Sequence, residues 1–293
     1  MHYINELEKL NITHKKFDEG FVKSVIENEY PFCRLLEYSV LFDKYTKTDK
    51  KGTFVNLDFE QLYAVARIDE ELSSFIICAF LDIERVLKAR LLTLKNRLNI
   101  SDDIVKQYIQ TDTEFLNKTY TPENRQVLIK YSKPIEALSI EEFLDVIQFG
   151  TFQRFCAYIY NTYTNKPYEY DNYIKSAYRL RNKAAHCEAI ITQLKEPFDY
   201  GTQSIVGFLR EKGIKHKTLT TNMSKALVFD FCNMMYLYCG IEPKYKIERT
   251  YKKLSGLLDS CKQYTELFAK NSMLVSVYRF MREVAEIFKN GIN

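Results

Sequence analysis

The chain has 293 residues, of which 46% are hydrophobic and 27% charged, a balance that is ordinary for folded globular proteins and excludes wholesale disorder. Nine glycines and six prolines are few for this length, which favours long helices over the many turns of a β-sandwich or barrel. The formal net charge of +4 permits an anionic partner without requiring one. We expect one or two domains.

The cysteines and the apolar segments bear on the cellular compartment. The seven cysteines are odd in number, scattered and without a CxxC pair, and most lie in apolar helical segments where we expect them to be buried. This usage is typical of a reducing compartment. The N-terminus lacks the apolar core of a signal peptide, and the most apolar run, ALVFDFCNMMYLYCGI, is too short and too interrupted by Asp230 and Asn233 to span a bilayer comfortably. We expect a cytoplasmic protein with no membrane partner, in which this run is a buried helix.

The clearest helical periodicity begins near Asp58. From there to Leu98, apolar residues recur mostly at spacings of three and four, and Asp58 with Gln61 suits the start of a helix. The pattern predicts one helix of about ten turns, with a break near Leu72 as the alternative. The stretch KTDKKGT before it, residues 47–53, is the best loop candidate of the first quarter.

Capping residues predict the helices that follow. Ser101 precedes two aspartates at the start of DDIVKQYI, where carboxylates suit the positive end of a helix dipole. Thr121 followed by proline opens PENRQVLIKY. Ser139 with Glu142 forms a capping box for IEEFLDVIQF, and Gly150 is the expected C-terminal stop of that helix.

The last part of the chain continues in helices. After Pro167 the segment YDNYIKSAYRLRNKAAHCEAI is expected to form one helix through Ile190. Two or three further helices fit near residues 202–212, 224–239 and 245–290. No stretch alternates over strand lengths, so the predicted fold class is all-α. We divide it into an N-terminal helical segment (1–55), a helical core (56–200) and a C-terminal helical extension (201–293).

The C-terminal extension is unevenly basic. Between Ile205 and Lys253 ten Lys or Arg residues accompany four Asp or Glu residues. Its basic tracts, REKGIKHK and KYKIERTYKK, supply four weak candidates for binding an RNA backbone: Lys215, Lys217, Lys252 and Lys253. A solvated helix face with lysines for solubility explains the same pattern as well.

The stretch RNKAAH contains three polar residues of interest, Arg181, Asn182 and His186. On a helix, Asn182 and His186 share one face within hydrogen-bonding reach, and Tyr178 extends the same stripe by one turn. Arg181 lies roughly 140° round the helix from His186, so these two flank a groove. Two such helices meeting across a symmetric dimer would gather two arginines and two histidines around one cleft.

This combination of side chains suits metal-free cleavage of RNA. Histidine exchanges a proton near neutral pH, and the guanidinium fork matches phosphate oxygens. His186 would take the proton of a ribose 2′-OH, the oxygen would attack the adjacent phosphate, and Arg181 would stabilise the charge that builds up on the phosphoryl oxygens. The products would be a 2′,3′-cyclic phosphate and a 5′-hydroxyl. The same spacing also arises by chance, so a structural role stays open on spacing alone.

The motif fits the Arg-polar-x-x-x-His signature of HEPN domains, the helical nucleotide-binding domains of many prokaryotic ribonuclease toxins and defence proteins. The segment LDFEQLYAVARIDEELSSFIICAFLDIERVLKARLL resembles the long helical segment of the AbiD/AbiF-like abortive infection family. Phe149, Gly150 and Thr151 match the end of that family's Ser-Phe-Gly-Thr segment, and residues 181–186 match its Arg-Asn-x-x-Ala-His block. The resemblance covers approximately residues 20 to 195.

The resemblance implies a HEPN helical core, a dimer-built active site and RNA cleavage in phage defence. His186 would be the general base, Arg181 the phosphate stabiliser, and Asn182 the residue that orients His186. The family often has a further Arg after the His, whereas this chain reads CEAII, and Arg179 or Lys183 is the nearest substitute.

Two further points follow from the resemblance. No Tyr follows two residues after His186, so we expect no nucleotidyltransferase antitoxin. Glu84 and Lys88 match the family's Glu and basic positions. A supporting role near His186 and an ordinary i,i+4 surface ion pair both stay open for them. Tyr178, on the same helix face as His186, is a third candidate for a supporting role.

We therefore expect an all-α, HEPN-type helical bundle with additional C-terminal helices that acts as a metal-independent endoribonuclease, an anti-phage effector or toxin. Its partners would be RNA, a second copy of the chain, and a neutralising small RNA or protein. A non-catalytic HEPN module that holds a structured small RNA is the first alternative, and a purely structural scaffold the second. No His, Cys or Asp cluster has ligand spacing and no glycine loop could hold phosphate, so we expect no metal site and no cofactor.

Overall fold

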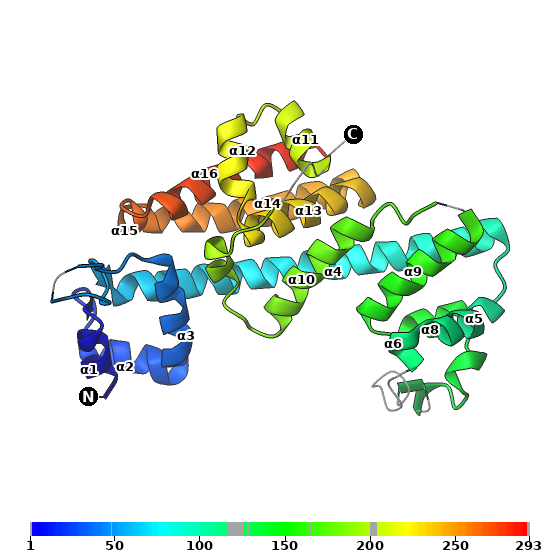
Figure 1. Cartoon of the computed structure of the whole chain (residues 1–293), viewed down its shortest axis with the longest axis horizontal. Coiled ribbons are helices and arrows are strands. Elements are labelled where there is room, and N and C mark those ends of the chain that lie inside the picture. Colours follow the sequence, from blue (N-terminus) through cyan, green and yellow to red (C-terminus); the bar gives the residue numbers. More distant parts are fainter. Residues whose placement is uncertain are drawn as a thin grey trace. The chain divides into compact units, whose positions relative to one another are not determined.

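The computed structural model describes residues 2–47, 49–116, 126–127, 129–164, 166–199 and 204–291. These residues are overwhelmingly helical, so the all-α prediction is confirmed (Figure 1). Their one sheet is a two-residue parallel pair of strands, β1 (Ile12–Thr13) with β2 (Leu57–Asp58). The chain divides into two compact units: residues 1–79 with 179–293 form unit 1, and residues 80–178 form unit 2. The division of the sequence at residues 55 and 200 stays a prediction.

The helix predicted near Asp58 is α4 (Phe59–Leu98), which is 40 residues long and unbroken. The Asp58 backbone N–H donates to Gln61 Oε1 at 2.9 Å, and Asp58 Oδ1 accepts from the Glu60 N–H at 3.0 Å. These bonds satisfy polar groups that the start of a helix leaves open. The predicted start is therefore confirmed, and the alternative break near Leu72 does not occur.

Short helices precede α4 in unit 1. They are α1 (His2–Lys9), α2 (Glu19–Asn28), α3 (Phe32–Glu37) and the 3-10 helix η1 (Tyr38–Leu41). The loop predicted at residues 47–53 lies between η1 and β2; residue 48 is outside the described residues, and the others form turns around Gly52, whose φ is +91°.

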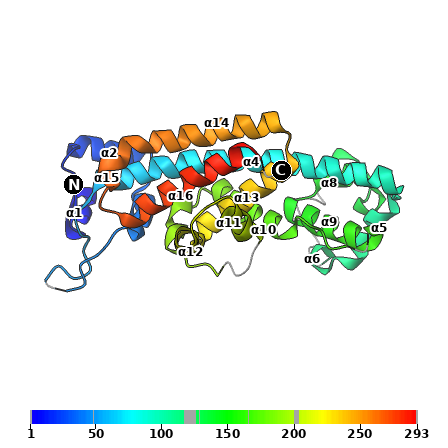
Figure 2. The same ribbon diagram turned by 90° about the horizontal axis from the view of Figure 1, so that it is seen from above.

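The rest of unit 1 follows the second half of α10 (Asp171–Ala185). Its elements are η3 (Ile190–Lys195), α11 (Ser204–Glu211), α12 (His216–Met223), α13 (Ala226–Ile241), α14 (Lys244–Ser260), η4 (Cys261–Tyr264), α15 (Thr265–Phe268) and α16 (Ser272–Lys289). Figures 1 and 2 show α13, α14 and α16 beside the first half of α4. The helices expected near 202–212 and 224–239 correspond to α11, within its described residues, and α13.

Two expectations, one about this region and one about the cysteines of the whole chain, are wrong. One helix over 245–290 does not form: α14 ends at Ser260, and α16 begins afresh where the Asn271 side chain caps the Leu274 N–H at 3.1 Å. Most cysteines are not buried, because Cys156, Cys232 and Cys239 are buried whereas Cys33, Cys78 and Cys187 are exposed and Cys261 is intermediate.

The apolar run predicted as a buried helix is α13, and this prediction is confirmed. Almost all of its side chains are buried, Asp230 and Asn233 included. Within the described part of the chain, no helix is long and apolar enough to cross a membrane.

Unit 2 contains the second half of α4 and the first half of α10. Between them lie α5 (Asp103–Thr111), α6 (Thr113–Leu116), η2 (Ile135–Ala137), α8 (Ile140–Val146) and α9 (Phe149–Thr164). The core of this unit is aromatic: the rings of Tyr108, Phe143 and Phe155 are buried, with centroids 5.0–6.0 Å apart. Such contacts between aromatic rings stabilise the fold by more than the burial of their apolar surface alone would.

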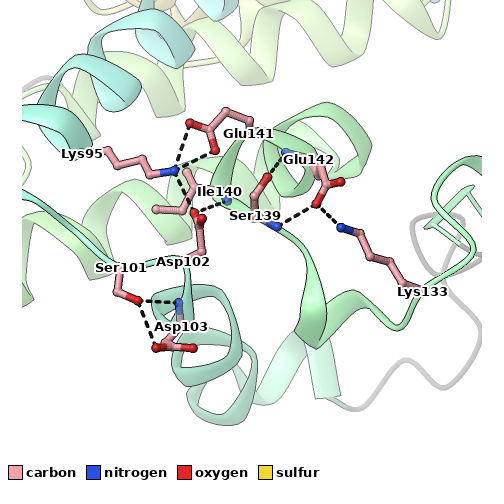
Figure 3. A network of polar contacts seen from close by, with 9 residues as sticks. All are labelled: Lys95, Ser101, Asp102, Asp103, Lys133, Ser139, Ile140, Glu141 and Glu142. Carbon is pink, nitrogen blue, oxygen red and sulfur yellow. Dashed lines mark hydrogen bonds and ion pairs between the residues drawn. The ribbon is translucent and has the colours of Figure 1, made fainter.

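A network of polar contacts fixes the starts of α5 and α8 (Figure 3). Ser139 and Glu142 form the predicted capping box. Ser101 Oγ accepts from the Asp103 N–H at 3.2 Å, as expected for a helix start, and Lys95 Nζ lies 2.8 Å from both Asp102 and Glu141. One cation on α4 thus joins two helix N-termini.

Gly150 is not a stop signal. α8 ends at Val146 because Ile147 is extended (φ −80°, ψ 148°), and Gly150 lies in the first turn of α9. A Cβ at Gly150 would lie 3.5 Å from the Tyr178 hydroxyl, which is an ordinary van der Waals contact, so the packing does not require glycine at this position. The helix start predicted at Thr121 lies outside the described residues; of the predicted segment PENRQVLIKY, residues 126–127 and 129–130 are described and are helical.

Candidate functional site

The candidate site forms where α10 ends. Cys187 has a left-handed φ of +53°. Its N–H donates to the Ala184 carbonyl at 3.1 Å, and the Glu188 N–H donates to the Lys183 carbonyl at 2.9 Å. These two bonds form a Schellman motif, which closes a helix and satisfies its last carbonyls. His186 is therefore the residue at which the helix turns into the following loop.

The expectation of one helix through Ile190 is wrong for the same reason. α10 ends at Ala185, and η3 begins at Ile190. Glycine or asparagine usually occupies the left-handed position of this motif, and a cysteine there gives no sequence signal.

His186 is exposed and lines a polar groove of unit 1. The walls of the groove come from α3, the end of α10 and η3. Beside His186, the groove is lined by five charged side chains: Arg34, Glu37, Lys183, Glu188 and Glu196. Two permanent cations and three carboxylates thus share the groove with one imidazole.

The structure separates His186 from Arg181 within one chain. Arg181 Nη1 donates to Asn182 Oδ1 at 3.0 Å, and neither residue is among those that line the groove. The bond between Asn182 and His186 is the backbone bond, from the His186 N–H to the Asn182 carbonyl at 2.9 Å. The predicted orientation of His186 by the Asn182 side chain stays a prediction.

A buried carboxylate behind the groove joins its two walls. Asp69 on α4 is 1% exposed and accepts from the Tyr38 hydroxyl at 2.8 Å and from the N–H groups of Ile191 and Ile190 at 2.8 and 3.2 Å. Arg34 Nη2 lies 3.4 Å from the same carboxylate. Burial raises the pKa of Asp69 above its ordinary value, although the hydrogen bonds from Tyr38 and Ile191 oppose the shift.

The sequence interpretation missed Arg34 and Asp69 as site residues. Asp69 follows Ile68 within a helix whose periodicity is apolar, and a carboxylate there is the signal that could have marked it. Arg34 offers no comparable signal, because it occupies an ordinary position of a short helix.

The Abi-like protein family matches residues 27–192, more than half of the chain. The chain belongs to this family. The matched segment contains α3, Asp69, the end of α10 and the start of η3, so most of the groove lies within it; the lining residues Gln193 and Glu196 follow its end. No curated protein and no solved structure matches this Abi-like chain.

The remaining candidates for RNA contact in the Abi-like protein lie at different places in unit 1. Arg179 forms a bidentate ion pair with buried Asp230, with Nε at 3.0 Å and Nη2 at 2.5 Å. Lys183 lies 3.9 Å from Glu196 at the groove. The candidates of the basic tracts are exposed, before or on α12 and on α14: Lys215, Lys217, Lys252 and Lys253.

Three further candidates of the Abi-like protein belong to unit 2. Lys88 forms the predicted i,i+4 ion pair with Glu84 at 2.8 Å, and its ammonium lies 6.0 Å from the centre of the Phe152 ring. The ring of Tyr178 packs at a tilt against Phe149, with centroids 5.4 Å apart. Their supporting role near His186 stays a prediction. Within the described ranges, no three His, Cys, Asp or Glu residues are grouped closely enough to hold a metal ion.

Proposed function

We propose that this Abi-like protein is a metal-independent endoribonuclease of the HEPN type that acts in abortive infection. The observation that carries the proposal is the exposed His186 in a polar groove, most of whose lining residues, His186 among them, lie within the family-matched segment. An imidazole that is exposed at a helix end can reach a substrate, whereas a structural histidine is usually enclosed by its hydrogen-bond partners.

The proposed reaction uses only groups of the protein and of the RNA. His186 removes the proton of a ribose 2′-OH, O2′ bonds to the adjacent phosphorus, and the bond from phosphorus to O5′ breaks. O5′ then takes up a proton, which leaves a 2′,3′-cyclic phosphate and a 5′-hydroxyl. Cations next to the phosphate stabilise the charge that develops on its oxygens.

A homodimer would complete the site. Arg181 lies outside the groove of its own chain, and the three carboxylates there offset Arg34 and Lys183. A second α10 packed against the first would add positive charge from Arg181 where a phosphate needs it. The protein should therefore sediment with about twice the 34.7 kDa mass of one chain.

The second candidate function is an RNA-binding module that does not cut. It is favoured by the exposed lysines of the basic tracts, Lys215, Lys217, Lys252 and Lys253, none of which pairs with a carboxylate of a described residue. Such lysines can neutralise phosphates, and binding would then weaken steeply with salt.

The test compares cleavage of mixed single-stranded RNA in EDTA by the wild type, by His186→Ala and by a matched control, His2→Ala. His2 is also exposed but lies at the start of α1, outside the residues that line the groove and outside the basic tracts. We expect His186→Ala to lose on the order of 100-fold or more in rate, the range for a general base, and His2→Ala to retain wild-type activity. Equal rates for the wild type and His186→Ala would refute the proposal. A protein that co-purifies with RNA, and that still cleaves no RNA after the bound RNA has been stripped, would favour the binding module.

A further inference from the structure

Asp69 is a charged side chain on the apolar face of α4, and it is unusual in having several donors converge on it. Taking a carboxylate out of water is costly unless hydrogen bonds replace its hydration. Here Oδ2 accepts from Tyr38, from the Ile190 N–H and, at longer range, from Arg34, while Oδ1 accepts from the Ile191 N–H.

The donors come from three elements that meet at the groove. Arg34 belongs to α3, Tyr38 to η1, and the two backbone N–H groups to the start of η3. Three residues, 187–189, separate His186 from Ile190. A displacement at Ile190 therefore reaches His186 through a turn that is short and already closed by the Schellman bonds.

We propose that Asp69 is a positioning residue that fixes the groove around His186, holding the η3 wall through two backbone hydrogen bonds and the α3 wall through Arg34. This inference rests on the proposed function, because the groove matters for activity only if it is the ribonuclease site. Asp69 itself is buried and touches no substrate; it acts through His186 and Arg34.

Asp69→Asn is the sharpest substitution, because the amide has nearly the shape of the carboxylate. An amide nitrogen donates instead of accepting, so in either orientation at least one η3 N–H faces another donor. The substitution also removes the charge that attracts Arg34. One wall therefore loses a hydrogen bond and the other loses an ion pair, while the volume of the side chain is kept.

Asp230→Asn is the matched control. Asp230 is the second buried carboxylate of unit 1 that pairs with an arginine, and it lies on α13, outside the groove lining. The Asp230→Asn substitution should lower the stability of unit 1 without moving the residues that line the groove. Tyr38→Phe removes one donor and leaves the carboxylate, so it serves as the milder variant if Asp69→Asn does not fold.

Two readouts are independent of activity. The first is hydrogen exchange at the amides of Ile190 and Ile191, which should be at least about tenfold faster in Asp69→Asn than in the wild type and unchanged in Asp230→Asn. The second is the ring NMR signal of His186, which is assignable because the chain has four histidines and His186→Ala removes one of their signals. Asp69→Asn should move this signal, Tyr38→Phe should move it less and in the same direction, and Asp230→Asn should leave it in place.

If Asp69 had only a structural role, Asp69→Asn would lower the stability of the protein as Asp230→Asn does, but the His186 signal would stay at its wild-type position. That result would overturn the inference. Where the wild type cleaves RNA, kcat should fall in Asp69→Asn while KM changes by less than about threefold, and an unchanged kcat counts against the inference. If the wild type does not cleave RNA, the ribonuclease proposal fails, and the exchange and NMR results still decide whether Asp69 positions the groove.

Discussion

Replacement of Arg179 by alanine tests whether this residue stabilises the folded protein, independently of any contact that it makes with RNA. Asp230 is 3% exposed and is held by two bonds to the Arg179 guanidinium. Arg179→Ala leaves that carboxylate buried without its cation. Breaking a buried ion pair by removing one partner costs about 3–5 kcal/mol.

The Arg179 side chain is itself 48% exposed, so water would reach part of the space that it leaves. We therefore expect a smaller loss, about 2–3 kcal/mol in the free energy of unfolding. The assay is urea denaturation followed by circular dichroism and by fluorescence, so that a separate transition of unit 2 would be recognised.

The double variant Arg179→Ala with Asp230→Asn separates the causes. Removing the uncompensated charge should restore part of the lost stability, so the double variant should be more stable than Arg179→Ala alone. A change of less than about 0.5 kcal/mol in Arg179→Ala, the range of an ordinary surface substitution, would refute the reasoning. So would a double variant that is no more stable than the single one.

Three further predictions concern local structure. Ser139→Ala removes the capping box of α8 and should cost about 1 kcal/mol in urea denaturation, whereas no loss would mean that the cap is dispensable. Cys187→Val should cost about 1–2 kcal/mol because a β-branched side chain resists a left-handed φ, and Cys187→Gly should be tolerated; equal stabilities of these two variants would contradict the prediction. Burial raises the pKa of Asp112, but hydrogen bonds from Tyr108 and Arg154 outweigh it and hold the pKa below the ordinary 3.8. The ionised carboxylate therefore stabilises the fold above about pH 4, and this contribution is lost as the pH falls through the lowered pKa. Asp112→Asn should flatten the decline of the unfolding free energy in acid, and a curve parallel to that of the wild type would refute this.

The elements that the sequence predicts correctly are those specified by local chemistry. The period of α4 is visible because its apolar residues repeat over 40 positions, and Asp58, Ser139 and Glu142 announce helix starts through bonds to residues nearby in the chain. The buried helix α13 is predictable because its apolar composition allows no exposed face.

The elements that the sequence does not predict depend on particular dihedral angles or on distant contacts. α10 ends at a left-handed cysteine, a position where composition gives no warning. Gly150 belongs to a residue type that often stops helices, but it lies in the first turn of α9, and α8 has already ended at Val146.

The candidate site shows the same division. The motif that contains His186 is visible in six consecutive residues, RNKAAH, although the end of α10 at this point is not. Arg34 and Asp69 are 35 positions apart, and Asp69 is 121 positions from Ile190, so only the folded chain brings these groups together.

The most direct measurement of the central claim uses an RNA with a single 2′-deoxyribose at a mapped cleavage position. If the RNA's own 2′-OH is the nucleophile, activated by His186, the wild type should cut the all-ribose RNA to a 2′,3′-cyclic phosphate and leave the substituted position intact. Cleavage at the deoxyribose position at the rate of the all-ribose RNA would contradict the account, because that position has no hydroxyl to attack the phosphate.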